Sequence, residues 1–426
     1  MYAKHASISK TLAVILALAI ALLGALPAFA ASPAEDALAG VLNYLDGKKA
    51  SLAFGDVGDQ SDWKAFALAR GGKTVPAAYL ASAVGALRAG PLDQSTDYAR
   101  AVLVLTAMEY DAGNFAGIDL LEPLLDIDTV TENLPNGPTF ALLALNCHSA
   151  YAIPAGYDLA LVDALLDEYT ALGWSAGLAV VDIDATAMAL QALAPYYGIA
   201  KVQVKVDAAL ALLAGEQFPS GGFGSDWGGG WHFEDSCSTA QVVTALSLLG
   251  LDAAVYFTRD TLAALLAFQE ADGGFDAAWG ENPFADSQAA YALLAYDFFK
   301  RGTGSLFDLS GAALAVYVDK SVLNARIAAL QSVAKGNNTD ASWRAFEAAL
   351  TAAQTVAAKA AATQAEVDSA LAGLNAAYGG LKGLTRLEKW EAKLPGWLRS
   401  IKSLPDWLEW VIYYVFFGWI WDVIYK

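Results

Sequence analysis

Apolar stretches with helical character recur along the chain, each centred on an alanine-leucine or valine-leucine pair. The pairs are Ala67-Leu68, Val104-Leu105, Ala144-Leu145, Ala192-Leu193, Ala245-Leu246 and Ala292-Leu293. These stretches are apolar on nearly all sides, which is typical of helices buried between other elements. Each step between neighbouring pairs is long enough for two helices and two turns, so the pattern predicts a repeated helical hairpin.

More amphipathic segments lie between these buried stretches. In PAAYLASAVGALR (residues 76–88) and VDAALALLAGEQF (residues 206–218), apolar residues recur every three or four positions, as in a helix with one buried face. With AEDALAGVLNYLDG (residues 34–47) as the first of them, the pattern gives six inner and six outer helices. The sequence therefore predicts an all-α fold whose main part is a closed α6/α6 toroid.

The turns before two of the inner helices share a motif. Gln217 precedes Gly221 by four residues, and Gln269 precedes Gly273 in the same way; Trp174 belongs to a weaker third copy. The paired glycines permit left-handed turn geometry, and the aromatic residue that follows can fill the gap between helices. The motif, L-x3-Q-x3-G-x-[FW], is similar to the repeat of the prenyltransferase and squalene oxidase family.

The resemblance extends from about Ala34 to Leu309 and implies the toroid fold. Terpene cyclases, prenyltransferase β-subunits, cobalamin carriers and many exported bacterial surface proteins share that fold, so it does not by itself imply an activity. Segments such as SDWKAFALARGGKTVP and SCSTAQVVTALSLLG look most like the surface proteins. We therefore expect residues 31–318 to form a toroid of this kind.

The composition changes near Val318, after which alanine, glutamine, threonine and lysine predominate and Gly-Gly turns are absent before residue 379. Thr339 or Asp340, and then Thr363, each precede a strongly helix-forming run. Residues 319–383 closely resemble a FIVAR module, a small three-helix unit of Gram-positive surface proteins. The resemblance implies either a spacer or a binder of wall or host glycans.

The tail, residues 384–426, ends in an aromatic-rich segment. Its run from Trp410 to Trp421 carries no charge and would be about 18 Å long as a helix, against about 30 Å for a hydrocarbon core. The tryptophans and tyrosines favour a helix in the membrane interface or docked on another protein. Packing of the tail on its own toroid is the alternative.

The N-terminus has the features of a signal peptide. Lys4 and Lys10 precede an apolar run over residues 12–23, and Ala28 and Ala30 frame an A-x-A cleavage site. The sequence therefore predicts that residues 1–30 are removed and that the protein is secreted and retained at the bacterial cell surface, on the wall or the outer face of the membrane.

Charge and cysteine content narrow the function further. The formal net charge is −19, whereas binding to nucleic acid needs a basic surface, so nucleic acid is excluded as a partner. Only Cys147 and Cys237 are present, so no disulfide framework holds the fold together. We expect both to be buried as small apolar residues; a disulfide between them is the alternative.

Asp182 and Asp184 precede an inner helix in VDIDATAMALQAL (residues 181–193). The stretch resembles the D-x-D-D-T-A motif of class II terpene cyclases, with Ala185 where that family has a further carboxylate. The resemblance implies Asp184 as the general acid on a polyprenyl substrate and Asp182 as its partner. The alternative is that Asp182 or Asp184 caps an inner helix that begins at Ala185, with or without contacting a ligand. Both interpretations place the carboxylates at the mouth of the toroid.

A second candidate site is GSDWGGGWHFEDSCSTAQ (residues 224–241). Asp235 and Cys237 resemble the D-x-C zinc ligands of prenyltransferase β-subunits, which use a histidine one repeat later as the third ligand. The matching stretch here has Asp286 and no histidine, which leaves His232 as a substitute. We predict no cofactor, with zinc at His232, Asp235 and Cys237 as the alternative.

The same loop is rich in glycine and aromatic residues, which suits a mobile aromatic lip that binds a ligand at the mouth of the toroid. Aromatic rings that only cover the helix ends are the alternative. The predicted ligand-binding residues are Trp227, Trp231, His232, Phe233, Asp235, Trp279 and Phe284.

Three functions follow from these features. The first is a non-catalytic surface protein whose toroid binds a small molecule, lipid or glycan, with the FIVAR module and the tail contacting the wall or membrane. The second is a terpene cyclase-like enzyme that uses Asp184. The third is a structural or adhesion protein with a filled centre. A surface module and an aromatic tail suit display and add nothing to catalysis, so the first and third are favoured over an enzyme.

Overall fold

The computed structural model describes residues 31–175, 177, 180–224, 232–278, 280–385, 388–389 and 393. These residues are predominantly helical, which confirms the all-α prediction. They fall into two compact units, one of residues 31–113 with Asp119–Ala315, the other of Asn114–Ile118 with the described residues from Val316 onward. The predicted signal peptide and nearly all of the aromatic tail lie outside the described residues.

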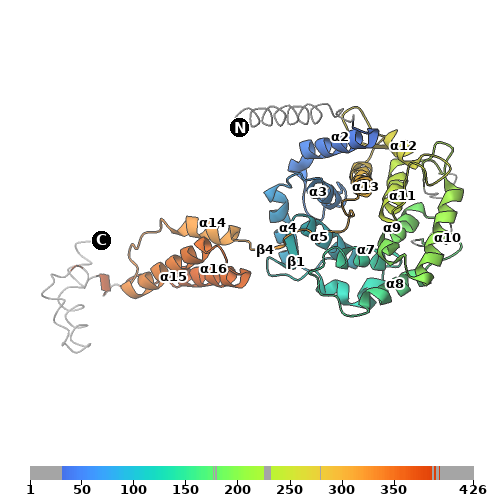
Figure 1. Cartoon of the computed structure of the whole chain (residues 1–426). Helices are drawn as coiled ribbons and strands as arrows, with labels where there is room; N and C mark the ends of the chain where they lie inside the picture. Colours follow the sequence, from blue (N-terminus) through green and yellow to red (C-terminus); the bar gives the residue numbers. More distant parts are fainter. Residues whose placement is uncertain are drawn as a thin grey trace, which may run out of the picture. The chain divides into compact units, whose positions relative to one another are not determined.

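The first unit is built around a ring of inner helices. In the described chain they are α3 (Ser61–Arg70), α5 (Ser95–Ala107), α7 (Asn136–Leu145), α9 (Ile183–Leu193), α11 (Ser236–Leu248) and α13 (Pro283–Arg301). Each packs against the next, and α13 packs against α3, so the ring is closed (Figure 1). Most of their apolar residues are buried, as expected for helices packed between other helices.

A second layer of helices lies outside this ring (Figure 1). Its described members are α2 (Pro33–Lys48), α4 (Ala77–Ala89), the short α6 (Ile127–Thr131), α8 (Tyr157–Asp167), α10 (Ala200–Glu216) and α12 (Thr261–Leu266), with short 3-10 turns η1 (Lys49–Ser51), η2 (Glu122–Leu125) and η3 (Ala194–Tyr196). The outer helices alternate with the inner ones along the chain. The last outer helix, α12, packs on the first one, α2, so the outer layer is also closed.

The glutamines of the repeated turn motif join each turn to the next outer helix. Gln217 Nε2 donates to the carbonyls of Gly221 (2.9 Å) and Arg259 (3.0 Å), the latter just before α12. Gln269 Nε2 donates to Gly273 (3.1 Å) and to Ala37 (2.9 Å) in α2. The second glutamine therefore connects the last turn to the first outer helix and helps to close the circuit.

The N-termini of three successive inner helices are capped in the same way. Asp182, Asp235 and Asn282 stand one residue before α9, α11 and α13, and each side chain accepts a hydrogen bond from a first-turn N–H. Asp182 Oδ1 accepts from the Ala185 N–H at 2.9 Å. Side chains of this type satisfy amide groups that the helix leaves without a partner.

A polar side chain four residues after each cap holds the preceding turn. In each case the N–H of the buried aromatic residue of that turn donates to the inner-helix side chain. The pairs are Trp174 with Thr186 Oγ1 (3.2 Å), Phe223 with Thr239 Oγ1 (2.9 Å) and Phe275 with Asp286 Oδ1 (2.9 Å). The turn and the helix start are thus fixed together in every one of these three repeats.

Two short strands form a hairpin in the first unit. Strands β2 (Asp276–Ala277) and β3 (Gly280–Glu281) pair antiparallel just before α13. In the second unit the end of β1 (Tyr110–Phe115) meets β4 (Ala315–Tyr317): the Ala116 N–H donates to the Tyr317 carbonyl (2.9 Å), and the Phe115 ring stacks on the Tyr317 ring.

The second unit also contains three helices, α14 (Ser321–Leu330), α15 (Asp340–Ala358) and α16 (Gln364–Gly379). They enclose a small core that includes Leu323, Phe346 and Leu374. Thr339 caps α15, and Thr363 caps α16 in a capping box with Glu366, as the helix-start signals indicate. In the parts of the chain that the structure describes, no helix is long and apolar enough to cross a membrane.

Candidate functional site

A cavity of about 430 Å³ lies between the inner helices of the first unit. Helices α3, α7, α9, α11 and α13 each supply at least one side chain to its described lining. This volume falls in the lower part of the range of small-molecule sites, about 300–1,000 Å³. The centre of the ring is therefore large enough for a small ligand.

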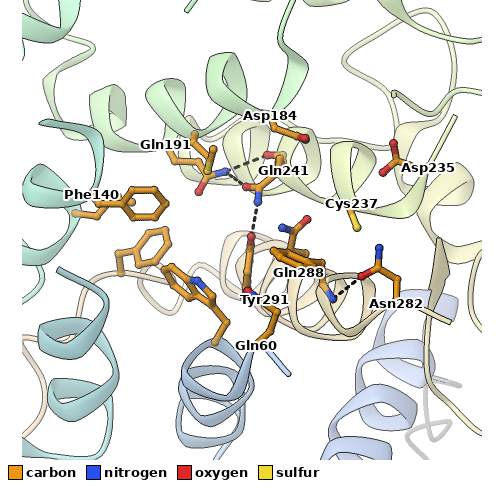
Figure 2. A pocket seen from close by; sticks show the side chains of 15 residues that line it. Gln60, Phe140, Asp184, Gln191, Asp235, Cys237, Gln241, Asn282, Gln288 and Tyr291 are labelled. Carbon is orange, nitrogen blue, oxygen red and sulfur yellow. Dashed lines mark hydrogen bonds between the residues drawn. The ribbon is translucent and has the colours of Figure 1, made fainter. Parts of the chain in front are cut away.

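Polar side chains line the side of the cavity formed by α9, α11 and α13 (Figure 2). They comprise two carboxylates, a thiol and several amides: Asp184, Asp235, Cys237, Gln191, Gln241, Asn282 and Gln288. Gln60, at the start of α3, also lines the cavity. The described lining contains no lysine, arginine or histidine. The charges that face the cavity are thus exclusively negative among these residues.

Three of the polar groups form a hydrogen-bonded chain across neighbouring inner helices. Gln191 Nε2 on α9 donates to Gln241 Oε1 on α11 (2.8 Å), and Gln241 Nε2 donates to the Tyr291 hydroxyl on α13. Burial, the largest influence, raises the pKa of Tyr291 well above its usual value, so this phenol stays protonated. The chain fixes the orientation of two amides that would otherwise be costly to bury.

Aromatic rings form much of the rest of the lining. The Trp63 ring on α3 lies 5.9 Å from the Phe140 ring on α7 and 5.7 Å from the Tyr291 ring, centroid to centroid. Phe307 also faces the cavity, with Leu143 and Met188 as the aliphatic members. We call Trp63, Phe140 and Tyr291 the aromatic wall.

The two aspartates of the cyclase-like motif have different positions. Asp182 is buried and caps α9 without lining the cavity, so the capping alternative is confirmed for this residue. Asp184, in the first turn of α9, is half-buried and lines the cavity. Helix α9 begins at Ile183 rather than at Ala185, so only Asp184 has access to a bound molecule.

Asp235 and Cys237, two of the three zinc candidates, both line the cavity. Asp235 is 4% exposed and its Oδ1 accepts from the Ser238 N–H (2.9 Å), which makes it the cap of α11. Burial raises the pKa of the Asp235 carboxyl. Burial, and then the charges of Asp235 and Asp184, raise the pKa of the Cys237 thiol far above its usual range. Within the described residues, no three histidine, cysteine, aspartate or glutamate side chains cluster as a metal site would require.

The predicted aromatic lip is only partly within the described residues. Phe284 lines the cavity and is 41% exposed. His232 is exposed with its ring against Phe218, and Phe233 is half-buried; neither belongs to the described cavity lining. Trp227, Trp231 and Trp279 lie outside the described residues.

The two cysteines are free, so the disulfide alternative is wrong. Cys147 is fully buried, and burial raises the pKa of its thiol to about 12. Cys237 is half-buried beside the cavity. Both thiols therefore remain protonated and weakly nucleophilic at neutral pH.

The amides and the aromatic wall are lining residues that sequence reasoning missed. A signal for them was present, because Gln241 and Gln288 are polar residues at matching places in two otherwise apolar inner helices, each six residues after the cap. A polar side chain in the middle of a buried helix needs a partner or faces a cavity.

No family model matches the chain, and no curated protein matches it as a relative.

Proposed function

We propose that this chain is an exported cell-surface protein that binds a small ligand in the centre of an α/α toroid without transforming it. Residues 31–318 would form an α6/α6 toroid of the prenyltransferase and squalene oxidase repeat type, and residues 319–383 a FIVAR-like spacer. The remaining tail, residues 384–426, would contact the wall or the membrane. The single observation that carries the ligand-binding function is the central cavity with its mixed polar and aromatic lining.

The cavity favours a binding protein over an adhesion protein with a filled centre. A purely structural toroid gains stability by packing its centre with side chains, because an empty cavity costs free energy in lost contacts. Here the centre holds about 430 Å³ of space, bordered by buried amides that are held in place by hydrogen bonds. An open cavity and buried amides lower the stability of the folded state, so this arrangement favours ligand recognition over a purely structural role.

A terpene cyclase-like enzyme is the second candidate, because Asp184 faces the cavity together with the aromatic wall. A cyclase steers a carbocation, and its cavity must not offer nucleophiles that would capture the cation. Gln191, Gln241 and Gln288 place amide groups in this cavity, and an amide oxygen is such a nucleophile. The lining therefore supports binding more than cyclisation.

A ligand screen on the full chain tests the proposal. We would measure the melting temperature with cobalamins, polyprenols and fragments of wall glycan, because a molecule that binds only the folded state raises it. The variant pair Cys237→Ala and Cys237→Phe gives a matched control at one lining position. A ligand of the cavity should stabilise the alanine variant and fail to stabilise the phenylalanine variant.

Two results would separate the candidate functions. Conversion of a polyprenyl substrate by the wild type, abolished by Asp184→Asn, would establish the cyclase. Stabilisation of both Cys237 variants by the same compound would place its site outside the cavity and refute the proposed binding function.

A further inference from the structure

The charge of the cavity lining has one sign. Asp184 and Asp235 are its charged residues, and no cationic side chain accompanies them in the described lining. The charges that act most on the Cys237 thiol, those of Asp235, Asp184 and Asp286, are all negative. An anionic ligand would be repelled here, whereas a cation would be attracted.

Burial strengthens this preference. Asp235 is 4% exposed, and burial raises the pKa of its carboxyl, which shows that its charge is poorly solvated. A carboxylate in such a place is destabilised unless a cation or further hydrogen-bond donors approach it. The Ser238 N–H already donates to Asp235 Oδ1 at 2.9 Å, but no cationic side chain lies in the described lining, so a positively charged ligand would supply the missing opposite charge.

The aromatic wall adds a second feature that favours a cation. Trp63 is its central ring, in contact with Phe140 and Tyr291, and an indole is the side chain whose face attracts cations most strongly. In Figure 2, Asp184 and Asp235 lie on the side of the cavity away from Phe140. A ligand with a cationic head and an apolar body can therefore reach carboxylates and rings at once.

The amides distinguish among cations. The Oε1 atom of Gln288 is buried and has no hydrogen-bond partner among the described residues, and this side chain lines the cavity. Like the carboxylates of Asp184 and Asp235, it can only accept. A ligand that donates N–H groups would satisfy this acceptor, whereas a quaternary ammonium has no proton to give.

From these features we infer that the central cavity binds an organic cation with N–H donors, an ammonium or guanidinium group carried on a small apolar or aromatic body. This inference rests on the proposed binding function and specifies its ligand class. The carboxylates of Asp184 and Asp235 hold the cationic head, Gln288 accepts one of its protons, and the aromatic wall covers the body.

Three probes of nearly equal shape test the charge preference on the full chain: phenylpropylammonium, phenylpropanol and phenylpropanoate. Isothermal titration calorimetry at low ionic strength should give the tightest binding for the ammonium, at least about tenfold tighter than for the alcohol, and no binding for the carboxylate. The trimethylammonium analogue separates charge from N–H donation, and should bind more weakly than the primary ammonium.

The variants Asp184→Asn and Asp235→Asn test the assigned residues. Asparagine is also a good helix cap, so Asp235→Asn should fold, which the melting temperature and circular dichroism would verify. Each variant should weaken ammonium binding by about tenfold or more and leave alcohol binding unchanged. The matched control is Asp260→Asn, the same change at the cap of outer helix α12 and outside this cavity, which should leave both affinities unchanged.

The outcomes distinguish this inference from the function on which it rests. If the alcohol or the carboxylate binds as tightly as the ammonium, or if both lining variants keep the ammonium preference, the cation inference is wrong while the cavity remains a binding site. If none of the three probes binds but a compound of the ligand screen does, the cation inference is wrong and the proposed binding function stands. If nothing in either set binds, both proposals fall.

Discussion

The contact between Thr239 and the turn before α11 offers a quantitative test of how the repeat is held together. The Thr239 side chain is fully buried, and its Oγ1 accepts the Phe223 N–H at 2.9 Å. The same hydroxyl donates to the Asp235 carbonyl at 2.7 Å or the Phe223 carbonyl at 3.2 Å. Replacement by valine keeps the shape of the side chain and removes these bonds.

The loss of unfolding free energy in Thr239→Val comes from one backbone group, the Phe223 N–H. The Asp235 carbonyl still receives the Thr239 N–H, and the Phe223 carbonyl still receives the Asp235 N–H, so both acceptors keep a partner. Only the Phe223 N–H loses its acceptor. A buried donor without a partner costs about 1–3 kcal/mol, and we expect the free energy of unfolding to fall by that amount.

Thr244→Val on the same helix is the matched control. Thr244 is also fully buried, but its hydroxyl only donates to the Ala240 carbonyl (2.8 Å) within the helix. Thr244→Val leaves no donor without a partner, so its free energy of unfolding should fall by less than about 1 kcal/mol. Urea denaturation should be fitted with separate transitions for the two units. Equal losses in both variants would refute the assigned role of Thr239.

Three further predictions concern backbone, thiols and charge. Gly273→Ala should lower the free energy of unfolding, measured by urea denaturation, by more than about 3 kcal/mol, because φ is +95° and the added Cβ would lie 2.6 Å from the Gly40 carbonyl oxygen. Gly302→Ala, at φ +62° with open space around the added Cβ, should lower it by about 1 kcal/mol. Similar losses in the two variants would contradict this reasoning. Cys147 should react with iodoacetamide more than about 100-fold faster in urea than in the folded protein, because burial raises the pKa of its thiol to about 12; equal rates would show that the thiol is accessible. Burial raises the pKa of Asp235 above its unfolded value, so ionisation of this carboxyl destabilises the folded state. Asp235→Asn should therefore raise the melting temperature at pH 7, but not below the unfolded pKa of about 3.9. An increase in melting temperature that is independent of pH would exclude ionisation as its cause.

Much of the helical framework was predictable because it follows from periodic burial. The alanine-leucine pairs mark inner helices, and the two copies of the turn motif make the same contact, because Gln217 and Gln269 each donate to the carbonyl of the glycine four residues later. The start of α9 was placed two residues late, because two aspartates precede it and the sequence does not say which is the cap. Cap choice depends on the φ and ψ angles of single residues, which hydrophobic periodicity does not specify.

The candidate site was predictable only in part. Asp184, Asp235, Cys237 and Phe284 stand near helix starts, where motif reasoning looks for chemistry, and all four line the cavity. The aromatic wall was missed because Trp63, Phe140 and Tyr291 lie within inner helices and belong to no recognisable motif. Which face of such a helix borders a cavity depends on how tightly its neighbours pack, and that is a property of the ring as a whole.

In three successive repeats, neighbouring positions at the start of the inner helix have either a structural contact or a place in the cavity lining. The position before each inner helix holds a cap in all three, and the position four residues later holds the preceding turn. Between them, two residues after the cap, stand Asp184, Cys237 and Phe284, whose side chains make neither of these two contacts and line the cavity. A carboxylate, a thiol and an aromatic ring can occupy this position because the repeat's own stability does not depend on it. The same division accounts for the start of α9: Asp182 and Thr186 hold the helix start, and the side chain of Asp184 between them lines the cavity.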